Sequence, residues 1–317
     1  MENNSARTDT ALWTGLYPAA TTQFAVDGSI DLPATRQGFL ELVEAGVDGL
    51  VLLGTCGENN SLEAAEKFAV LEMAVEAVAG AVPLIAGVSE FTTKTAAAYA
   101  KRAEAIGVDG LMVLPAMVYV PTPEELYGHF AGVATATQLP IMLYNNPPAY
   151  RVQIDFDTLD RLRNVTNVVA IKESAPDPRR ITDVINRYGD RFKVMAGLDD
   201  VALEGLFLGA CGWVSGLTSA FPRESVELLA AFNRGDFDAA RRIYRWFMPL
   251  LHLDADHDLV QSIKLAQQIM GHGSERVRMP RMPLAGARRA SVTAMVQTAA
   301  ATRPLRSGAG VSRVASI

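Results

Sequence analysis

Lys172 ends a run of strand-forming residues in the stretch NVVAIKESAPDPRR, residues 167–180. The four residues before it, 168–171, are apolar, and burial among such residues favours the neutral amine because desolvation penalises the charged form. A neutral amine can add to the carbonyl carbon of a 2-oxo acid and give a protonated Schiff base, which withdraws electrons from a neighbouring C–C or C–H bond. A single lysine at a strand end is more often solvated, so this chemistry needs partner residues.

Tyr144 and Thr55 carry hydroxyl groups suited to the proton transfers of such a reaction. Tyr144 ends another apolar run, in YNNP, and Thr55 lies in GTCGE, residues 54–58. We expect Tyr144 to carry the proton and Thr55 to orient Tyr144 and relay the proton. Loop 54–58 precedes a helix expected to begin near Asn60 or Ser61, so its backbone N–H groups could hold a substrate carboxylate. Taken one at a time, both motifs could equally be tight turns.

A near-repeat indicates how the chain is organised around these residues. AGVDGLVLLGT, residues 45–55, returns as IGVDGLMVLPA, residues 106–116, and LGACGWVSG, residues 208–216, has the same arrangement. In each copy a glycine ends a helical run and a short apolar run follows. Short strands that are apolar on both faces are typical of parallel sheets.

Eight short apolar runs alternate with helical patterns along the chain. The runs cover residues 15–20, 49–54, 83–87, 110–114, 140–144, 168–172, 193–196 and 212–215. The helical patterns include residues 61–79, 93–106 and 122–137, and the last begins with a capping box of Thr122 and Glu125. This alternation predicts an α/β fold, a (β/α)8 TIM barrel, rather than an open sheet.

The barrel is expected to occupy residues 1–223 and to carry the active site at the C-terminal ends of its strands. The motifs that end the second, fifth, sixth, seventh and eighth strands would then meet at one opening. A C-terminal helical extension is expected over residues 224–302, where no further strand pattern occurs. Residues 303–317 are mostly small and polar, and we expect a disordered tail there.

The composition argues against several classes of function. A net charge of −6 and a pI near 5.3 disfavour a nucleic-acid partner and an anionic membrane surface. The N-terminus lacks the features of a signal peptide, and no apolar run could span a bilayer. The chain has two cysteines, Cys56 and Cys211, so we expect no disulfide framework and a cytoplasmic location. Its four histidines form no HExxH pair, and we expect neither a metal site nor a cofactor.

Four motifs together resemble a known family. They are GTCGENNSLEAAEK from residue 54, YNNPPAYRVQID from residue 144, VVAIKES from residue 168, and AGLDD…GACGWVSG…FP from residue 196. In order and spacing the chain resembles, over about residues 15–284, the dihydrodipicolinate synthase / N-acetylneuraminate lyase family. These are class I Schiff-base aldolases and lyases on a TIM barrel with a C-terminal helical extension. The resemblance implies a lyase or aldolase that acts on pyruvate or another 2-oxo acid and assembles as a homodimer or homotetramer.

The resemblance also implies a role for individual residues. Lys172 matches the Schiff-base lysine, Tyr144 the catalytic tyrosine, and Thr55 the threonine of the proton relay. Gly197 and the carbonyl group of Val214 match positions that line the substrate site.

Three positions depart from the pattern of the family. Cys56 replaces the second threonine of GTTGE; it keeps the backbone N–H group that helps to bind the carboxylate but loses the hydroxyl contact. Ala149 replaces the arginine with which dihydrodipicolinate synthases bind a second carboxylate, and Arg151 could substitute for it. Met117 lies near the position of a second tyrosine that those enzymes donate across a dimer interface, with Tyr119 slightly beyond.

These departures weaken an assignment to lysine biosynthesis as a 4-hydroxy-tetrahydrodipicolinate synthase, because a site that lacks its charged partner loses that substrate. The alternatives implied by the family are a sialate lyase, a 2-keto-3-deoxy sugar-acid aldolase or dehydratase, and a pyrroline-carboxylate deaminase. Asn146, Asn59 and Asn145 could bind substrate hydroxyl groups, or they could be turn residues. A non-catalytic 2-oxo-acid-binding regulator and a metal-dependent aldolase are the alternatives from other classes. None of the eight strand ends carries a histidine for the latter.

Overall fold

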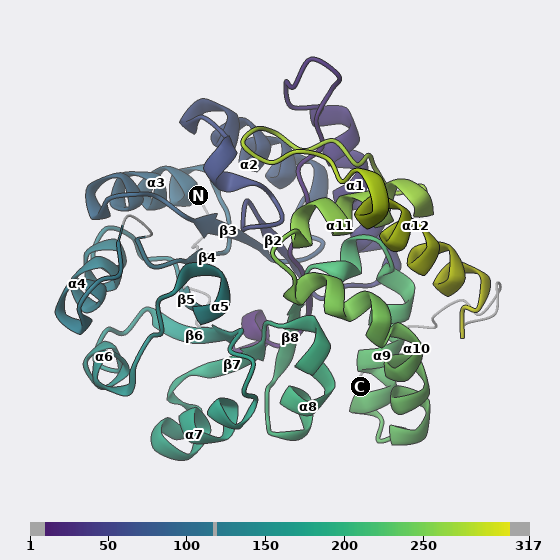
Figure 1. The fold of residues 1–317 in the computed structure, drawn as a ribbon. Helices are drawn as coiled ribbons and strands as arrows, with labels where there is room; N and C mark the ends of the chain where they lie inside the picture. Colours follow the sequence, from purple (N-terminus) through teal and green to yellow (C-terminus); the bar gives the residue numbers. More distant parts are fainter. Residues whose placement is uncertain (1–9, 117–118, 305–317) are drawn as a thin grey trace.

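The computed structural model describes residues 10–116 and 119–304. Eight parallel strands form a barrel surrounded by helices, in the order β1-β8-β7-β6-β5-β4-β3-β2 (Figure 1). A parallel bridge between Ala19 and Val51 joins the two ends of this order. The predicted TIM barrel is therefore confirmed.

The strands are short and largely buried. They are β1 (Gly15–Pro18), β2 (Leu50–Leu52), β3 (Leu84–Val88), β4 (Gly110–Val113), β5 (Ile141–Asn145), β6 (Val168–Glu173), β7 (Lys193–Ala196) and β8 (Gly212–Ser215). β3, β4 and β5 are buried along their whole length, which accounts for their apolar residues on both faces. All eight strands overlap the predicted runs. β2 is shorter than predicted, and Leu53, just after it, has a φ of 55° and belongs to no strand.

Helices and short 3-10 turns connect the strands. The α-helices are α1 (Leu32–Ala45), α2 (Ala64–Val78), α3 (Thr93–Ile106), α4 (Pro123–Ala134), α5 (Pro147–Tyr150), α6 (Phe156–Leu162), α7 (Arg179–Tyr188), α8 (Ala202–Phe207), α9 (Pro222–Asn233), α10 (Phe237–Ala255), α11 (Leu259–Met270) and α12 (Gly286–Ala301). The 3-10 turns are η1 (Thr10–Trp13), η2 (Asn59–Ser61), η3 (Gly189–Arg191), η4 (Asp199–Val201) and η5 (Leu217–Ser219). α3 matches its predicted range, and Thr122 and Glu125 form the predicted capping box of α4. α2 starts at Ala64 rather than near Ser61, because η2 intervenes and Glu63 caps the helix.

The GVDG segments of the near-repeat have the same structure in both copies. Gly46 and Gly107 end α1 and α3 with φ angles of 95° and 101°, a left-handed conformation that costs glycine little. Two residues later, the carboxylate of Asp48 accepts a hydrogen bond from a backbone N–H group of β1 (2.8 Å), and that of Asp109 accepts one from β3 (2.9 Å). Each aspartate therefore ties the end of a helix to a neighbouring strand.

The C-terminal helices contact the loop that follows β2. α10 packs against α9, and α11 and α12 pack against α10 and against each other (Figure 1). Lys264 of α11 and Glu58 of the loop form a fully buried ion pair (2.9 Å), and Lys264 also donates to the carbonyl oxygen of Thr22 (2.8 Å). The second carboxylate oxygen of Glu58 accepts a hydrogen bond from the backbone N–H group of Arg278 (3.0 Å). The extension thus holds the loop that carries Thr55.

The predicted division into a barrel and an extension stays a prediction. Its boundary after residue 223 falls in the first turn of α9, which starts at Pro222. Arg303 pairs with the buried Glu224 of α9 (2.5 Å), whereas the rest of the expected tail, from residue 305, lies outside the described residues. Met117 lies outside them too. Among the helices that the structure describes, none has the length and hydropathy needed to cross a membrane.

Candidate active site

Lys172 lies in β6, one residue before its end, and is only 5% exposed. It is in register with Tyr144 of β5 on one side and with Met195 of β7 on the other. Its Nζ atom lies 4.2 Å from the centroid of the Tyr144 ring. No carboxylate of the described residues forms an ion pair with Lys172. The contact with the ring is therefore a direct interaction between this amine and Tyr144.

The loops after β6 and β5 hold Lys172 and Tyr144 in place. The carboxylate of Glu173, the residue after Lys172, accepts hydrogen bonds from Asn145 Nδ2 (2.7 Å) and Arg180 Nε (2.9 Å). Because Asn145 follows Tyr144 in β5, this buried network fixes the ends of both strands relative to each other. Asn145 therefore bonds to protein groups rather than facing the cavity.

Tyr144 is buried, and its hydroxyl oxygen accepts a hydrogen bond from Asn146 Nδ2 (3.0 Å). Burial raises the pKa of the Tyr144 hydroxyl, and the hydrogen bond from Asn146 partly offsets this effect. Asn146 also caps α5, since its side-chain oxygen accepts a hydrogen bond from Ala149 N (3.1 Å). One residue thus positions the tyrosine hydroxyl and starts the next helix.

Thr55 lies in the loop after β2, and its hydroxyl group is hydrogen-bonded to that of Tyr150. Tyr150 is the last residue of α5, and its ring packs edge-to-face against the Tyr144 ring, with centroids 5.6 Å apart. Among the described residues, Thr55 and Tyr144 form no hydrogen bond with each other. The expected relay between them stays a prediction, and the structure adds Tyr150 to this cluster of hydroxyl groups.

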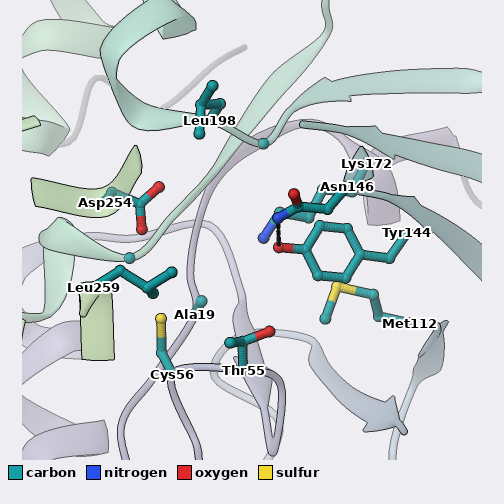
Figure 2. A pocket seen from close by; sticks show the side chains of 12 residues that line it. Ala19, Thr55, Cys56, Met112, Tyr144, Asn146, Lys172, Leu198, Asp254 and Leu259 are labelled. Carbon is teal, nitrogen blue, oxygen red and sulfur yellow. Dashed lines mark hydrogen bonds between the residues drawn. The ribbon is translucent and has the colours of Figure 1, made fainter. Parts of the chain in front are cut away.

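These residues line one cavity at the C-terminal ends of the strands (Figure 2). Six predicted residues line it: Thr55, Cys56, Tyr144, Asn146, Lys172 and Gly197. Its volume is about 20 Å³, which is enough to hold water.

Gly197 follows β7 and has no room for a side chain. A Cβ atom at this position would lie 2.5 Å from Lys172 Cγ and closer still to Ser174 Oγ. The backbone N–H group of Gly197 donates to the carbonyl oxygen of Glu173 (2.8 Å). The glycine therefore leaves the space that the lysine side chain occupies.

Cys56 is buried in the wall of the cavity. Burial raises the pKa of its thiol, and the nearby Asp254 raises it further. The thiol therefore ionises less readily than that of an exposed cysteine.

Two of the predicted substrate-binding residues are not in the lining. Val214 is buried in β8, and Arg151 is exposed after α5 with a φ of 58°. Asn59 is also outside the lining, because its side chain donates to the carbonyl oxygen of Gly87 (3.1 Å). Tyr119 is 60% exposed and donates to Glu125 (2.9 Å).

Sequence reasoning missed several residues around the cavity. Six of them line it: Ala19, Met112, Leu198, Gly216, Asp254 and Leu259. Asp254 could have been found, because it follows the buried Phe247 and Leu250 of α10 by seven and four residues, on the apolar face of the helix. Tyr150 could have been found from its place in YNNPPAY, where a short helix returns the chain toward Tyr144. Among the described residues, no group of three or more His, Cys, Asp or Glu side chains could hold a metal ion.

Comparison with known proteins agrees with this geometry. A model of the dihydrodipicolinate synthetase family matches residues 12–299. The chain belongs to this family. It is therefore an enzyme, a lyase of the Schiff-base aldolase type.

Members of the dihydrodipicolinate synthetase family resemble the chain over most of its length. It is 34% identical to 4-hydroxy-tetrahydrodipicolinate synthase 2 of Halalkalibacterium halodurans, over 84% of this chain and 91% of that protein. The crystal structure of dihydrodipicolinate synthase DapA-2 of Bacillus anthracis has a TM-score of 0.86 at 32% identity, over 90% of this chain and 98% of that one. The structure of YagE, a prophage protein of this family from E. coli K12 in complex with pyruvate, has a TM-score of 0.85 at 28% identity, over 91% of this chain and 99% of that one.

Proposed function

We propose that Lys172 forms a Schiff base with pyruvate or another 2-oxo acid. The amine adds to the carbonyl carbon and water leaves, which gives an iminium ion. A C–C, C–O or C–N bond of the substrate can then break with the iminium as electron acceptor, and Tyr144 transfers the proton. The observation that carries this proposal is the burial of Lys172 in the cavity against Tyr144, 4.2 Å from its ring centroid.

The loop after β2 would bind the carboxylate of the 2-oxo acid. The backbone N–H groups of Thr55 and Cys56 donate to no acceptor among the described residues, and both residues line the cavity. N–H groups that are already oriented bind a carboxylate without the cost of ordering them. The buried pair of Glu58 and Lys264 would keep this loop in place.

The hydroxyl groups of Thr55 and Tyr150 would extend the proton path from Tyr144. Tyr150 is half-buried, and its ring packs against that of the buried Tyr144. Its hydrogen bond to Thr55 orients both groups. Tyr150 would act through Thr55 and is therefore a positioning residue.

The broad substrate class we infer is a hydroxylated or 2-keto-3-deoxy acid that undergoes aldol cleavage or condensation, dehydration or deamination. Asn146 in the cavity supports a hydroxylated substrate. The names of the relatives support a second candidate, 4-hydroxy-tetrahydrodipicolinate synthase. Against it, Ala149 and Arg151 are both exposed and outside the lining, and Lys172 is the one cationic side chain of that lining. We also infer a cytoplasmic homodimer or homotetramer, as is general in the family.

Borohydride trapping tests this proposal. The protein is incubated with pyruvate and borohydride, its intact mass is measured, and the adduct is mapped by peptide digestion. We expect one adduct, at Lys172, which Lys172→Ala abolishes and Tyr144→Phe retains. Tyr144→Phe should lower turnover by about 10²- to 10⁴-fold. An adduct elsewhere, or none, would refute the Schiff-base proposal.

Activity assays on a panel of 2-oxo acids separate the candidate functions. Rapid condensation of pyruvate with aspartate semialdehyde would favour the synthase, and cleavage, dehydration or deamination of a hydroxylated acid would favour the broader reading. Trapping at Lys172 without turnover of any acid on the panel would favour a regulator.

A further inference from the structure

Asp254 brings a carboxylate from the C-terminal extension into the cavity of Lys172. It lies near the end of α10, is partly exposed, and lines the cavity together with Thr55, Tyr144 and Lys172. In Figure 2 its carboxyl group faces the cavity from the side opposite Tyr144 and Asn146. The extension therefore takes part in the site itself, besides holding the loop after β2.

The carboxyl group of Asp254 has few protein partners. Within the described residues, its one hydrogen bond is a long one, from Asp199 N to Oδ2 (3.4 Å). The neighbouring Asp199 differs, because its carboxylate accepts hydrogen bonds from Trp213 Nε1 (2.8 Å), Ser215 Oγ (3.2 Å) and Leu217 N (2.9 Å). An ionised carboxylate has about four acceptor sites. Asp199 is thus occupied with holding β8, whereas Asp254 has acceptor sites left for a ligand.

The surroundings of Asp254 leave its Oδ1 atom next to the substrate space. A Cβ atom on Gly216 would collide with Asp254 Oδ1 and lie 3.3 Å from Cys56 Sγ, so the glycine lets the acid and the thiol approach each other. The Cys56 thiol is only a weak hydrogen-bond donor. Leu259, on the next helix, lines the same side and has no polar group. Neither neighbour can satisfy a carboxylate.

We propose that Asp254 selects the substrate, because it accepts a hydrogen bond from a hydroxyl group or a protonated nitrogen of the bound 2-oxo acid. This inference rests on the proposed function and names the substrate class more closely. Hydrogen bonds to a charged acceptor are about twice as strong as neutral ones. A second carboxylate in the same place would be repelled by Asp254 and would find no cation besides Lys172. The preferred substrates therefore end in a donor group, and dicarboxylates are excluded.

A purely structural role makes a different prediction. If Asp254 only accepts the hydrogen bond from Asp199 N, an asparagine keeps that acceptor and should leave substrate preference unchanged. The test is therefore the preference among ligands rather than stability or overall rate.

The experiment compares four acids as ligands of the full-length protein. They are 2-oxobutanoate with an apolar end, 4-hydroxy-2-oxobutanoate with a hydroxyl group, 5-amino-2-oxopentanoate, which equilibrates with its cyclic imine, and 2-oxoglutarate with a second carboxylate. Their affinities are measured by calorimetry and by competition with pyruvate for borohydride trapping. We expect 4-hydroxy-2-oxobutanoate or 5-amino-2-oxopentanoate to bind about 10- to 100-fold more tightly than 2-oxobutanoate. We expect 2-oxoglutarate to bind most weakly. The stronger of the two donor ligands identifies whether the site is built for a hydroxyl group or for a nitrogen.

Three variants complete the experiment. Asp254→Asn should reduce the advantage of the donor ligand about tenfold and improve binding of 2-oxoglutarate, and Asp254→Leu should remove the advantage. Asp200→Asn is the matched control, because it removes the same charge from a residue of η4 that pairs with His252 (2.8 Å) and lies outside the cavity lining. It should leave the ranking unchanged. Melting temperatures verify that each variant is folded, and either Asp254 variant suffices for the test.

The outcomes separate this inference from the proposed function. If pyruvate is trapped at Lys172 but Asp254→Asn or Asp254→Leu ranks the four acids as the native protein does, the inference about Asp254 is wrong. If no adduct forms at Lys172, the proposed function is wrong, and calorimetry still decides whether Asp254 sets the preference.

Discussion

The hydroxyl groups of Thr55 and Tyr150, 95 residues apart in the chain, are hydrogen-bonded to each other beside the ring of Tyr144. All three hydroxyl side chains belong to one chain. The family pattern has a second tyrosine donated across a dimer interface, and Tyr150 offers a hydroxyl group without that partner. It follows that the proton path proposed here is complete within a single subunit.

Removal of the Tyr150 hydroxyl group should slow proton transfer without affecting Schiff-base formation. We expect Tyr150→Phe to lower kcat about tenfold, less than direct loss of a proton-transfer group. KM for pyruvate and trapping at Lys172 should hardly change. The measurements are steady-state kinetics, borohydride trapping and the solvent isotope effect on kcat, which should rise as proton transfer limits the rate.

Tyr119→Phe is the matched control for this change, because it removes the hydroxyl group of an exposed tyrosine bonded to Glu125. It should leave kcat unchanged. If Tyr119→Phe lowers kcat and Tyr150→Phe does not, the second tyrosine comes from the segment after β4 instead.

The preference set by Asp254 should depend on pH. Burial raises the pKa of Asp254 to about 6, and the positive charge of Lys172 limits the rise. The other titratable groups around it are Asp199, Asp200 and Cys56. Above pH 6 Asp254 is charged and repels 2-oxoglutarate; below pH 6 it is protonated, so this repulsion is lost. The affinity for 2-oxoglutarate relative to 2-oxobutanoate should therefore rise as pH falls from 7.5 to 5, and in Asp254→Asn it should stay flat.

The buried ion pair of Lys264 and Glu58 should be costly to break. Both side chains are fully buried, so Lys264→Met leaves the Glu58 carboxylate with one more distant cation, Arg281 at 3.9 Å, and should lower the free energy of unfolding by about 3–5 kcal/mol. Activity should fall with stability, since the loop of Thr55 loses its support. Chemical denaturation measures the change, and the double variant with Glu58→Gln should lose less than the sum of the two single variants.

An exposed ion pair provides the comparison for this prediction. Arg102 and Glu72 lie on the surface with side chains 52% and 53% exposed, so Arg102→Met should cost at most about 1 kcal/mol. If both variants lose the same free energy of unfolding, burial does not determine how much an ion pair contributes to stability.

Gly197 should tolerate no side chain, because a Cβ atom would overlap Lys172 Cγ. We expect Gly197→Ala to lower the free energy of unfolding by about 1–3 kcal/mol. It should also slow adduct formation with pyruvate, since the lysine must move. Gly128→Ala in α4 is the matched control: no atom outside its own turn of helix lies within 4 Å of its Cβ position, and alanine favours a helix by up to about 1 kcal/mol. A fully stable Gly197→Ala with normal trapping would contradict the contact.

The sequence alone determined the barrel, because the features that specify it are local. An apolar run such as residues 110–114 predicts a strand, and a glycine such as Gly46 or Gly107 predicts the end of a helix. Both signals depend only on neighbouring residues in the sequence. The motifs of Lys172, Tyr144 and Thr55 also lie at the ends of strands, and because barrel strands end at one opening, the sequence alone places these residues together.

Only the tertiary structure decided which further side chains reach that opening. Asp254 enters it from α10, a helix outside the barrel, and its position depends on how the extension packs. The short helix α5 ends at Tyr150, and the backbone of the next residue, Arg151, has a φ of 58°. Tyr150 therefore reaches Thr55, whereas Arg151 remains exposed. Two adjacent residues thus have different surroundings. Contacts between segments far apart in the chain determine these surroundings, and no local sequence pattern predicts them.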